Sequence, residues 1–163
     1  MRTLLLLIVC SYCLASDITI TSKIDIDKLV SKLAKSFDLE RSVKTIIKIE
    51  SDDGKYLINL QDPSCGITHI NIKTYMKRHN IRDTAFNRNK SCQDLINNHK
   101  LAIANAIEEL LFWQEYHCDK NGCTNEQYQN MIKSYNAGWN FRSKKAKEYY
   151  SRFLKAYKEL FKD

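Results

Sequence analysis

Three short polar segments of the sequence carry side chains that could act together in catalysis. The first, residues 46–51, places Glu50 directly after an apolar run, and the other two are residues 66–71 and residues 134–139. Burial of a carboxyl group against apolar neighbours disfavours its charged form, so its pKa rises and it can hold a proton near neutral pH. Glu50 is therefore our candidate for a general acid.

Apolar spacing predicts mainly helices around these segments. Gly (four) and Pro (one) are scarce, which argues against the many tight turns of an all-β fold. One stretch alone, residues 55–60, has a strand-like pattern, and it follows an Asp-Asp-Gly turn. The sequence predicts a mainly α fold with at most a small β-hairpin and with helices over residues 26–37, 43–50, 71–79, 92–116, 125–135 and 142–161. The helix over 92–116 has apolar residues on more than one face, so we expect it to be central and buried.

The N-terminal residues have the pattern of a secretory signal. Arg2 precedes an apolar run over residues 4–10, and small residues follow at positions 13–16. The run is shorter than the roughly 20 residues that span a bilayer. We expect a signal peptide over residues 1–16, a single domain over 17–163 and no stable membrane insertion after cleavage. An uncleaved anchor is the alternative.

Four cysteines remain after the expected cleavage: Cys65, Cys92, Cys118 and Cys123. An even number in an exported chain indicates disulfides, and four cysteines allow three pairings. We favour Cys118–Cys123, which closes a short loop, together with Cys65–Cys92. A zinc site is the rival hypothesis because His117 adjoins Cys118, but paired Cys-x-x-Cys units are absent from the sequence, so neither a metal nor a cofactor is expected.

The three polar segments, in their order along the chain, resemble the soluble lytic transglycosylase family of the goose-lysozyme-like superfamily. That family has Glu-Ser at a helix end, a Gly-Leu-Met-Gln-Ile-like segment, a long buried helix and then Tyr-Asn-Ala-Gly. The resemblance covers about residues 42–139. Residues 66–71, with Ala85-Phe86 and Cys92 downstream, are most similar to the members that accompany type IV secretion systems. Thr68 and His69 depart from the family pattern, which has Met and Gln there.

The resemblance implies a lysozyme-like helical domain that cleaves peptidoglycan. The bond cut is the β-1,4 bond between N-acetylmuramic acid and N-acetylglucosamine, and the muramic acid's own 6-hydroxyl closes onto its anomeric carbon to give a 1,6-anhydro end. Glu50 would be the single acid/base: it protonates the departing glycosidic oxygen and then takes the proton from the 6-hydroxyl. The acetamido group of the substrate would support the positive charge at the anomeric carbon.

The same resemblance implies a set of substrate-binding residues around Glu50. We expect Gly66 to let the backbone approach a sugar closely, and Tyr135 to lie near the catalytic acid. His69 can donate a hydrogen bond to a sugar and titrates near neutral pH, which would give activity an unusual pH dependence. The expected substrate-binding residues are Ser51, Gly66, Thr68, His69, Tyr135 and Asn136. Trp113 is expected in the core, and a role for Trp139 in sugar stacking stays open.

Two other functions stay open at this point. A hydrolytic lysozyme would need a second carboxylate across the bond, for which Asp52, Asp53 and Asp62 are the candidates. A peptidoglycan-binding module without catalysis is the other, because Thr68 and His69 depart from the family pattern.

The net charge of +7 favours a polyanionic partner. The sequence has no recognisable nucleic-acid-binding signature, so we expect a monomer that binds peptidoglycan strands and not nucleic acid. The expected location is the periplasm or the cell exterior, and wall remodelling, a secretion or conjugation machine and a phage machine are all possible settings.

Overall fold

The computed structural model describes residues 23–120 and 122–162, so the expected signal peptide over residues 1–16 lies outside the described residues. The fold is mainly α with one small sheet, as the sequence predicts. The elements in chain order are α1 (Lys23–Ala34), η1 (Lys35–Phe37), α2 (Glu40–Ser51), β1 (Ile58–Asn59), β2 (Ser64–Cys65), β3 (Ile70–Asn71), α3 (Ile72–Arg78), α4 (Ala85–Asn97), α5 (His99–His117), α6 (Asn125–Ala137), η2 (Gly138–Asn140) and α7 (Lys144–Leu160).

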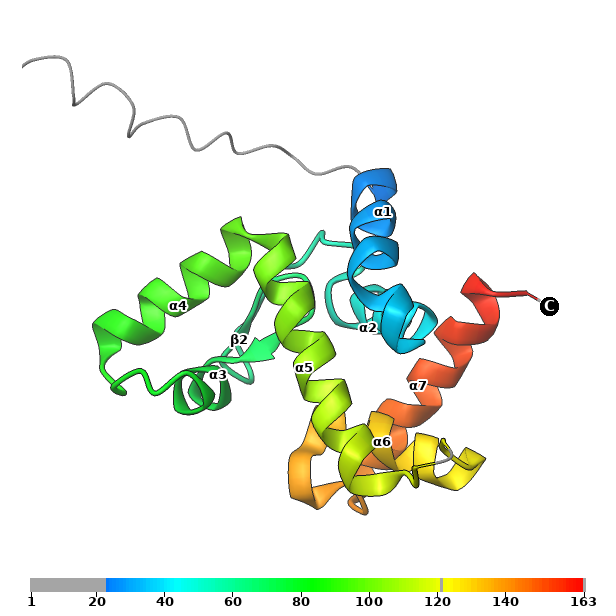
Figure 1. Cartoon of the computed structure of the whole chain (residues 1–163). Coiled ribbons are helices and arrows are strands. Elements are labelled where there is room, and N and C mark those ends of the chain that lie inside the picture. Colours follow the sequence, from blue (N-terminus) through cyan, green and yellow to red (C-terminus); the bar gives the residue numbers. More distant parts are fainter. Residues whose placement is uncertain (1–22, 121, 163) are drawn as a thin grey trace, which may run out of the picture.

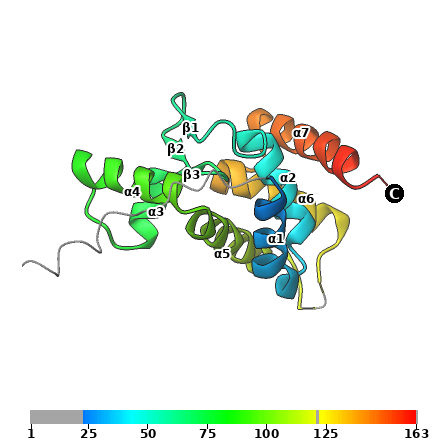
Figure 2. The same ribbon diagram turned by 90° about the horizontal axis from the view of Figure 1, so that it is seen from above.

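Helix α5 is the central element of the fold. Two views at right angles place α3, α4 and the sheet on one side of the molecule and α1, α2, α6 and α7 on the other, with α5 running between them (Figures 1 and 2). Helix α5 contacts α1, α2, α4, α6 and β3. Its side chains are buried over much of its length, at Ala102, Ile103, Asn105, Ala106, Ile107, Leu110 and Trp113. The expectation of a central, buried helix is confirmed.

The long helix predicted over residues 92–116 is wrong in one respect, because the structure divides this stretch into α4 and α5. The break lies at Asn98, whose backbone N–H still bonds to the carbonyl of Asp94 while its side chain accepts a hydrogen bond from the N–H of Leu101. The Asn98 side chain thus caps the start of a new helix, an arrangement that competes with continuous helical hydrogen bonding. The apolar periodicity alone contained no sign of this change of direction.

The sheet has three very short antiparallel strands in the order β1-β2-β3, one strand more than a hairpin. Ile58 pairs with Cys65 and Cys65 pairs with Ile70, so β2 is the middle strand. The segment from Gly66 to His69 is the turn between β2 and β3 and lies against α4 and α5. The sheet therefore fixes the position of the second polar segment relative to the central helix.

Both expected disulfides are present. Cys65–Cys92 joins β2 to α4 with a Cα–Cα distance of 5.3 Å, and Cys118–Cys123 closes the loop after α5 with a Cα–Cα distance of 4.7 Å. Because the Cys118 sulfur is bonded to Cys123, its thiolate is not available to bind zinc beside His117.

Helix α7 packs against α2 and α6 through an apolar stripe. Ala146, Tyr149, Phe153 and Ala156 are buried on this face, whereas Leu154 is exposed. Within residues 23–120 and 122–162, no helix combines the length and the hydropathy that crossing a bilayer requires.

Candidate active site

A groove with a volume of about 1220 Å³ runs across the molecule, and all three polar segments reach it. This volume exceeds the roughly 300–1,000 Å³ of most small-molecule pockets. Glu50 comes from the end of α2, His69 from the turn before β3, and Tyr135 and Asn136 from the end of α6. The fold therefore brings together residues that are separated by as much as half of the chain.

Glu50 lies in the last turn of α2, and its side chain is only 15 % exposed. Tyr135 and Tyr149 lie close to it. The pKa of each tyrosine is raised well above the usual value, mainly because the hydroxyl is buried and secondly because the Glu50 carboxylate is near. The Tyr149 hydroxyl is buried and interacts with Glu50 without a hydrogen bond of standard geometry. The residues that shield the carboxyl group thus come from α6 and α7. The apolar run before Glu50 suggested Ile46, Ile47 and Ile49 for this role: Ile46 and Ile47 are buried in the core, whereas Ile49 lines the groove with Glu50.

His69 is a close polar neighbour of Glu50, with its Nδ1 atom 3.4 Å from Glu50 Oε2. Its Nε2 atom lies 2.8 Å from the backbone oxygen of Tyr56, so Nε2–H donates to that carbonyl. The neutral ring then has no proton on Nδ1. A proton on Nδ1 would give a charged ring that faces the Glu50 carboxyl group, an interaction that favours the protonated form of His69.

The backbone of His69 has a φ of +47°, in the left-handed region that most residues avoid. Such strain persists only where surrounding structure enforces it, and it is concentrated at functional sites. Here it directs the ring toward Glu50. Burial alone would lower the pKa of His69, but the Glu50 carboxylate and the Tyr56 carbonyl outweigh burial and raise it.

A pH-dependent contribution of His69 to stability follows from this raised pKa. A base whose pKa is higher in the folded chain stabilises the fold below its unfolded pKa and loses that contribution as pH rises through its folded pKa. We expect His69→Gln to lower the melting temperature more at pH 5.5 than at pH 9. Thermal unfolding followed by circular dichroism at several pH values measures the difference.

His99 is a matched control, because burial lowers its pKa. The stabilising contribution of His99 is lost as pH falls, so the effect of His99→Gln should change with pH in the opposite direction. A destabilisation by His69→Gln that stays constant or grows toward pH 9 would contradict the raised pKa of His69.

Three of the expected substrate-binding residues lie behind the groove wall and do not line it: Ser51, Gly66 and Thr68. The Ser51 hydroxyl donates to the carbonyl of Ile67 at 2.7 Å, which fastens the end of α2 to the second polar segment. The Thr68 hydroxyl donates to the carbonyl of Ala102 at 3.1 Å, and the Thr68 carbonyl accepts from the Tyr135 hydroxyl at 2.9 Å. The expectation that Ser51 and Thr68 contact substrate is wrong for this geometry: they position the residues that do line the groove.

Gly66 is also needed for packing and not for contact with a sugar. Its φ is +82°, and a Cβ atom added there would lie 2.8 Å from the backbone oxygen of Leu95 and 3.2 Å from Ala102 Cβ. The close approach that the sequence predicts is therefore to α4 and α5.

Asn136 lines the groove as expected, at the end of α6. Its side-chain oxygen is buried and has no hydrogen-bond partner within the part of the chain that the structure describes. Buried polar atoms are nearly always paired, so an acceptor in this position indicates a donor from a ligand or from solvent.

Sequence reasoning missed Glu109 and Arg78, which form an ion pair on the groove wall. Glu109 also accepts a hydrogen bond from the indole N–H of Trp113, one helical turn later. A buried tryptophan needs an acceptor for its N–H, and a glutamate four residues earlier lies on the same helix face. The spacing of Glu109 and Trp113 was therefore a sequence signal for Glu109. No feature of the sequence pointed to Arg78.

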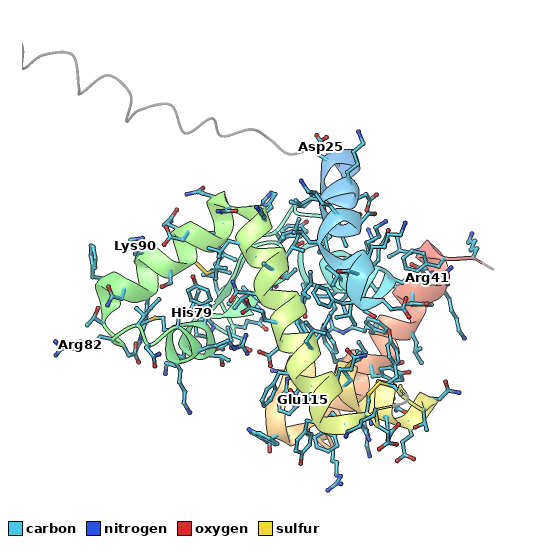
Figure 3. All side chains as sticks on the ribbon, viewed as in Figure 1. Asp25, Arg41, His79, Arg82, Lys90 and Glu115 are labelled. Atoms are coloured by element: carbon cyan, nitrogen blue, oxygen red, sulfur yellow. A yellow bond between two sulfur atoms is a disulfide. The ribbon has the colours of Figure 1, made fainter. Side chains whose placement is uncertain are left out.

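Helix α3, which supplies Arg78 to the groove, is held against α5. His79 lies where the end of α3 approaches α5 (Figure 3), and its Nε2 atom is 2.8 Å from Asn105 Oδ1. Asn105 in turn donates to the carbonyl of Leu101. The hydrogen bond between His79 and Asn105 therefore ties the end of α3, next to Arg78, to the central helix α5.

The aspartates considered as a second carboxylate fall into two groups. Asp52 and Asp53 bind Lys48 and do not line the groove, and hydrogen bonds from Lys48 and Lys55 lower the pKa of Asp52 to about 2. Asp62 does line the groove, and the Asn71 side chain donates to it at 3.0 Å. The structure therefore leaves Asp62 as the one aspartate of the three that lines the groove.

Comparison with known proteins gave no match to a family model, to a curated protein or to a solved structure.

Proposed function

We propose that this protein cuts the glycan strands of peptidoglycan as a lytic transglycosylase, with Glu50 as its single acid/base. The observation that carries the proposal is the meeting of Glu50, His69 and Tyr135 in one groove. These residues belong to the three segments on which the resemblance rests, and they are far apart in sequence.

The surroundings of Glu50 suit proton transfer in both directions. Its carboxyl group is shielded by Tyr135 and Tyr149, and His69 Nδ1 lies 3.4 Å from its Oε2 atom. In the proposed reaction Glu50 donates a proton to the glycosidic oxygen as the bond to the anomeric carbon breaks. The muramic 6-hydroxyl oxygen then bonds to that carbon, and its proton returns to Glu50. The proton balance is closed without water.

The groove also has the apolar wall that sugar rings require. Tyr56, Ile58 and Leu60 alternate along the β1 segment, and all three line the groove while at least half of each side chain is exposed. Alternate residues of an extended segment lie on one face. A pyranose ring has an apolar C–H face and polar edges, so this exposed apolar wall suits the face of a sugar ring.

Hydrolysis is the second candidate, because Asp62 and Glu109 are carboxylates on the groove wall. An inverting or retaining glycosidase needs a second carboxylate to activate water or attack the sugar. Glu109 is engaged by Arg78 and Trp113, and Asp62 by Asn71. These engagements favour the mechanism with one acid.

The mass of the products distinguishes these reactions. We expect digestion of purified wall sacculi to release fragments with 1,6-anhydromuramic ends, which are one water lighter than reducing ends. Liquid chromatography with mass spectrometry measures the two. Reducing ends alone would establish hydrolysis and reject the transglycosylase. If the protein binds sacculi but releases no fragments, the non-catalytic peptidoglycan-binding module is the function that remains.

The two disulfides fit an oxidising compartment. We propose the periplasm or the cell exterior, where peptidoglycan is reached. The net charge of +7 supports binding to a wall that carries carboxylates.

A further inference from the structure

Four aromatic residues form a cluster where the C-terminal end of α5 meets η2. Phe112, Trp113 and Tyr116 lie on α5, and Trp139 reaches them from η2. The ring centroid of Trp139 is 4.9 Å from those of Trp113 and Tyr116 and 6.3 Å from that of Phe112, all in edge-to-face geometry. We call Phe112, Tyr116 and Trp139 the aromatic platform.

The platform is exposed although its rings are held in place. Trp139 is 64 % exposed, Tyr116 55 % and Phe112 48 %, whereas Trp113 beneath them is 3 % exposed. Trp113 is fixed by its hydrogen bond to Glu109. Single exposed apolar residues are normal, but several adjacent ones mark a binding surface.

The platform continues directly from the groove. Trp113, Gly138 and Trp139 all line the groove, and Phe112 and Tyr116 extend the aromatic surface beyond it. Gly138 ends α6 with a φ of +55°, a conformation suited to glycine, and the turn there brings Trp139 over α5. In Figure 3 this end of α5 is marked by Glu115, at the opposite end of the helix from the junction with α4.

We propose that the aromatic platform is a distal sugar subsite, which binds a pyranose of the glycan strand where Trp139 lines the groove and Phe112 and Tyr116 continue the aromatic surface beyond it. This inference rests on the proposed function. A strand that follows the groove past Trp139 brings its next sugar onto Phe112 and Tyr116, which lie beyond the groove lining. The apolar C–H face of a pyranose matches an exposed, rigid aromatic ring, and edge-to-face neighbours keep that ring ready to stack.

The subsite makes cleavage depend on the length of the glycan. Short fragments fill the groove alone, whereas longer strands also gain the stacking contact. Aromatic contacts of this kind are worth about 0.5–1.5 kcal/mol, and about 1.4 kcal/mol corresponds to a factor of ten. The gain should be seen in KM, since the platform does not touch the reacting atoms.

The experiment compares kcat and KM on peptidoglycan glycan fragments of four sugars and of eight or more sugars. We expect Trp139→Ala and Tyr116→Ala to lower the long-to-short ratio of kcat/KM about tenfold and about threefold, respectively, mainly through KM. Phe86→Ala is the matched control: Phe86 is 76 % exposed on α4 and does not line the groove, so the ratio should not change. Thermal unfolding checks that each variant folds. If Trp139→Ala does not fold, the result for Tyr116→Ala decides whether the subsite exists.

An unchanged ratio in both platform variants would overturn the subsite while leaving the proposed function standing. If the wild type cuts no fragment, the proposed function fails, and calorimetric binding of the same fragments decides the subsite separately. Tighter binding of long fragments that is lost in Trp139→Ala supports it, and binding that is equal for both lengths rejects it.

Discussion

Replacing Glu50 with glutamine is expected to leave the fold intact and to lower the rate of wall cleavage about a thousandfold or more. Glutamine has nearly the same shape but cannot give up or accept a proton as a carboxyl group does, and proton transfer of this kind contributes roughly 10²–10⁴ in rate. Release of soluble fragments from purified sacculi measures the loss. Because Glu50 is enclosed by Tyr135, Tyr149 and His69, water does not readily replace it.

Glu40→Gln is the matched control for this variant. It is the same substitution on the same helix, but Glu40 lies at the start of α2, where it binds Ser31 and Lys44 outside the groove. We expect its activity to equal that of the wild type. A Glu50→Gln protein that cuts within a factor of ten of the wild type would remove Glu50 as the acid/base.

The second large effect is expected on stability, from Gly66→Ala. The new methyl group would lie 2.8 Å from the Leu95 carbonyl oxygen, which belongs to the backbone of α4 and cannot move aside cheaply. A side chain at positive φ adds about 1–2 kcal/mol of strain, and overpacking adds about 1–3 kcal/mol. We expect the free energy of unfolding to fall by about 2–4 kcal/mol, measured by urea denaturation.

Gly54→Ala separates the two causes. Gly54 has a φ of +89°, close to that of Gly66, but its added Cβ would meet Ile67 Cδ1 at an ordinary 3.5 Å. It should cost the backbone strain alone, about 1–2 kcal/mol. Equal losses in the two variants would show that the contact with Leu95 is unimportant. A Gly66→Ala protein that is fully stable but has lost substrate affinity would restore the original interpretation, in which Gly66 faces a sugar.

The sequence was sufficient to predict most helices, because a buried stripe leaves a period of 3.6 residues in the apolar pattern. Helix α7 is the clearest case, with Ala146, Tyr149 and Phe153 buried as their spacing predicts. The division at Asn98 could not be predicted in this way, since both α4 and α5 keep apolar residues. The only sign of the division in the sequence was the tendency of asparagine to cap helices, and the neighbouring Asn97 has the same tendency.

The candidate site was predictable in its parts but not in their roles. Glu50, His69, Tyr135 and Asn136 line the groove, whereas Ser51, Gly66 and Thr68 support it from behind. A sequence motif does not show which of its members is turned inward, because that depends on the helix packed against it. The contact of Tyr149 with Glu50 depends on how α7 packs against α2, which no periodicity specifies.

The scattered origin of the groove has a consequence for a cell that makes this protein. Glu50, His69 and Tyr135 are supplied by parts of the chain that meet only when α5 is in place between the two sides of the fold. A polypeptide that has its helices but not yet their packing holds no such groove. Under the proposed function, the newly made chain therefore cannot cut peptidoglycan until its helices have packed, and during refolding wall-cutting activity should appear with tertiary structure, after helix content has already recovered.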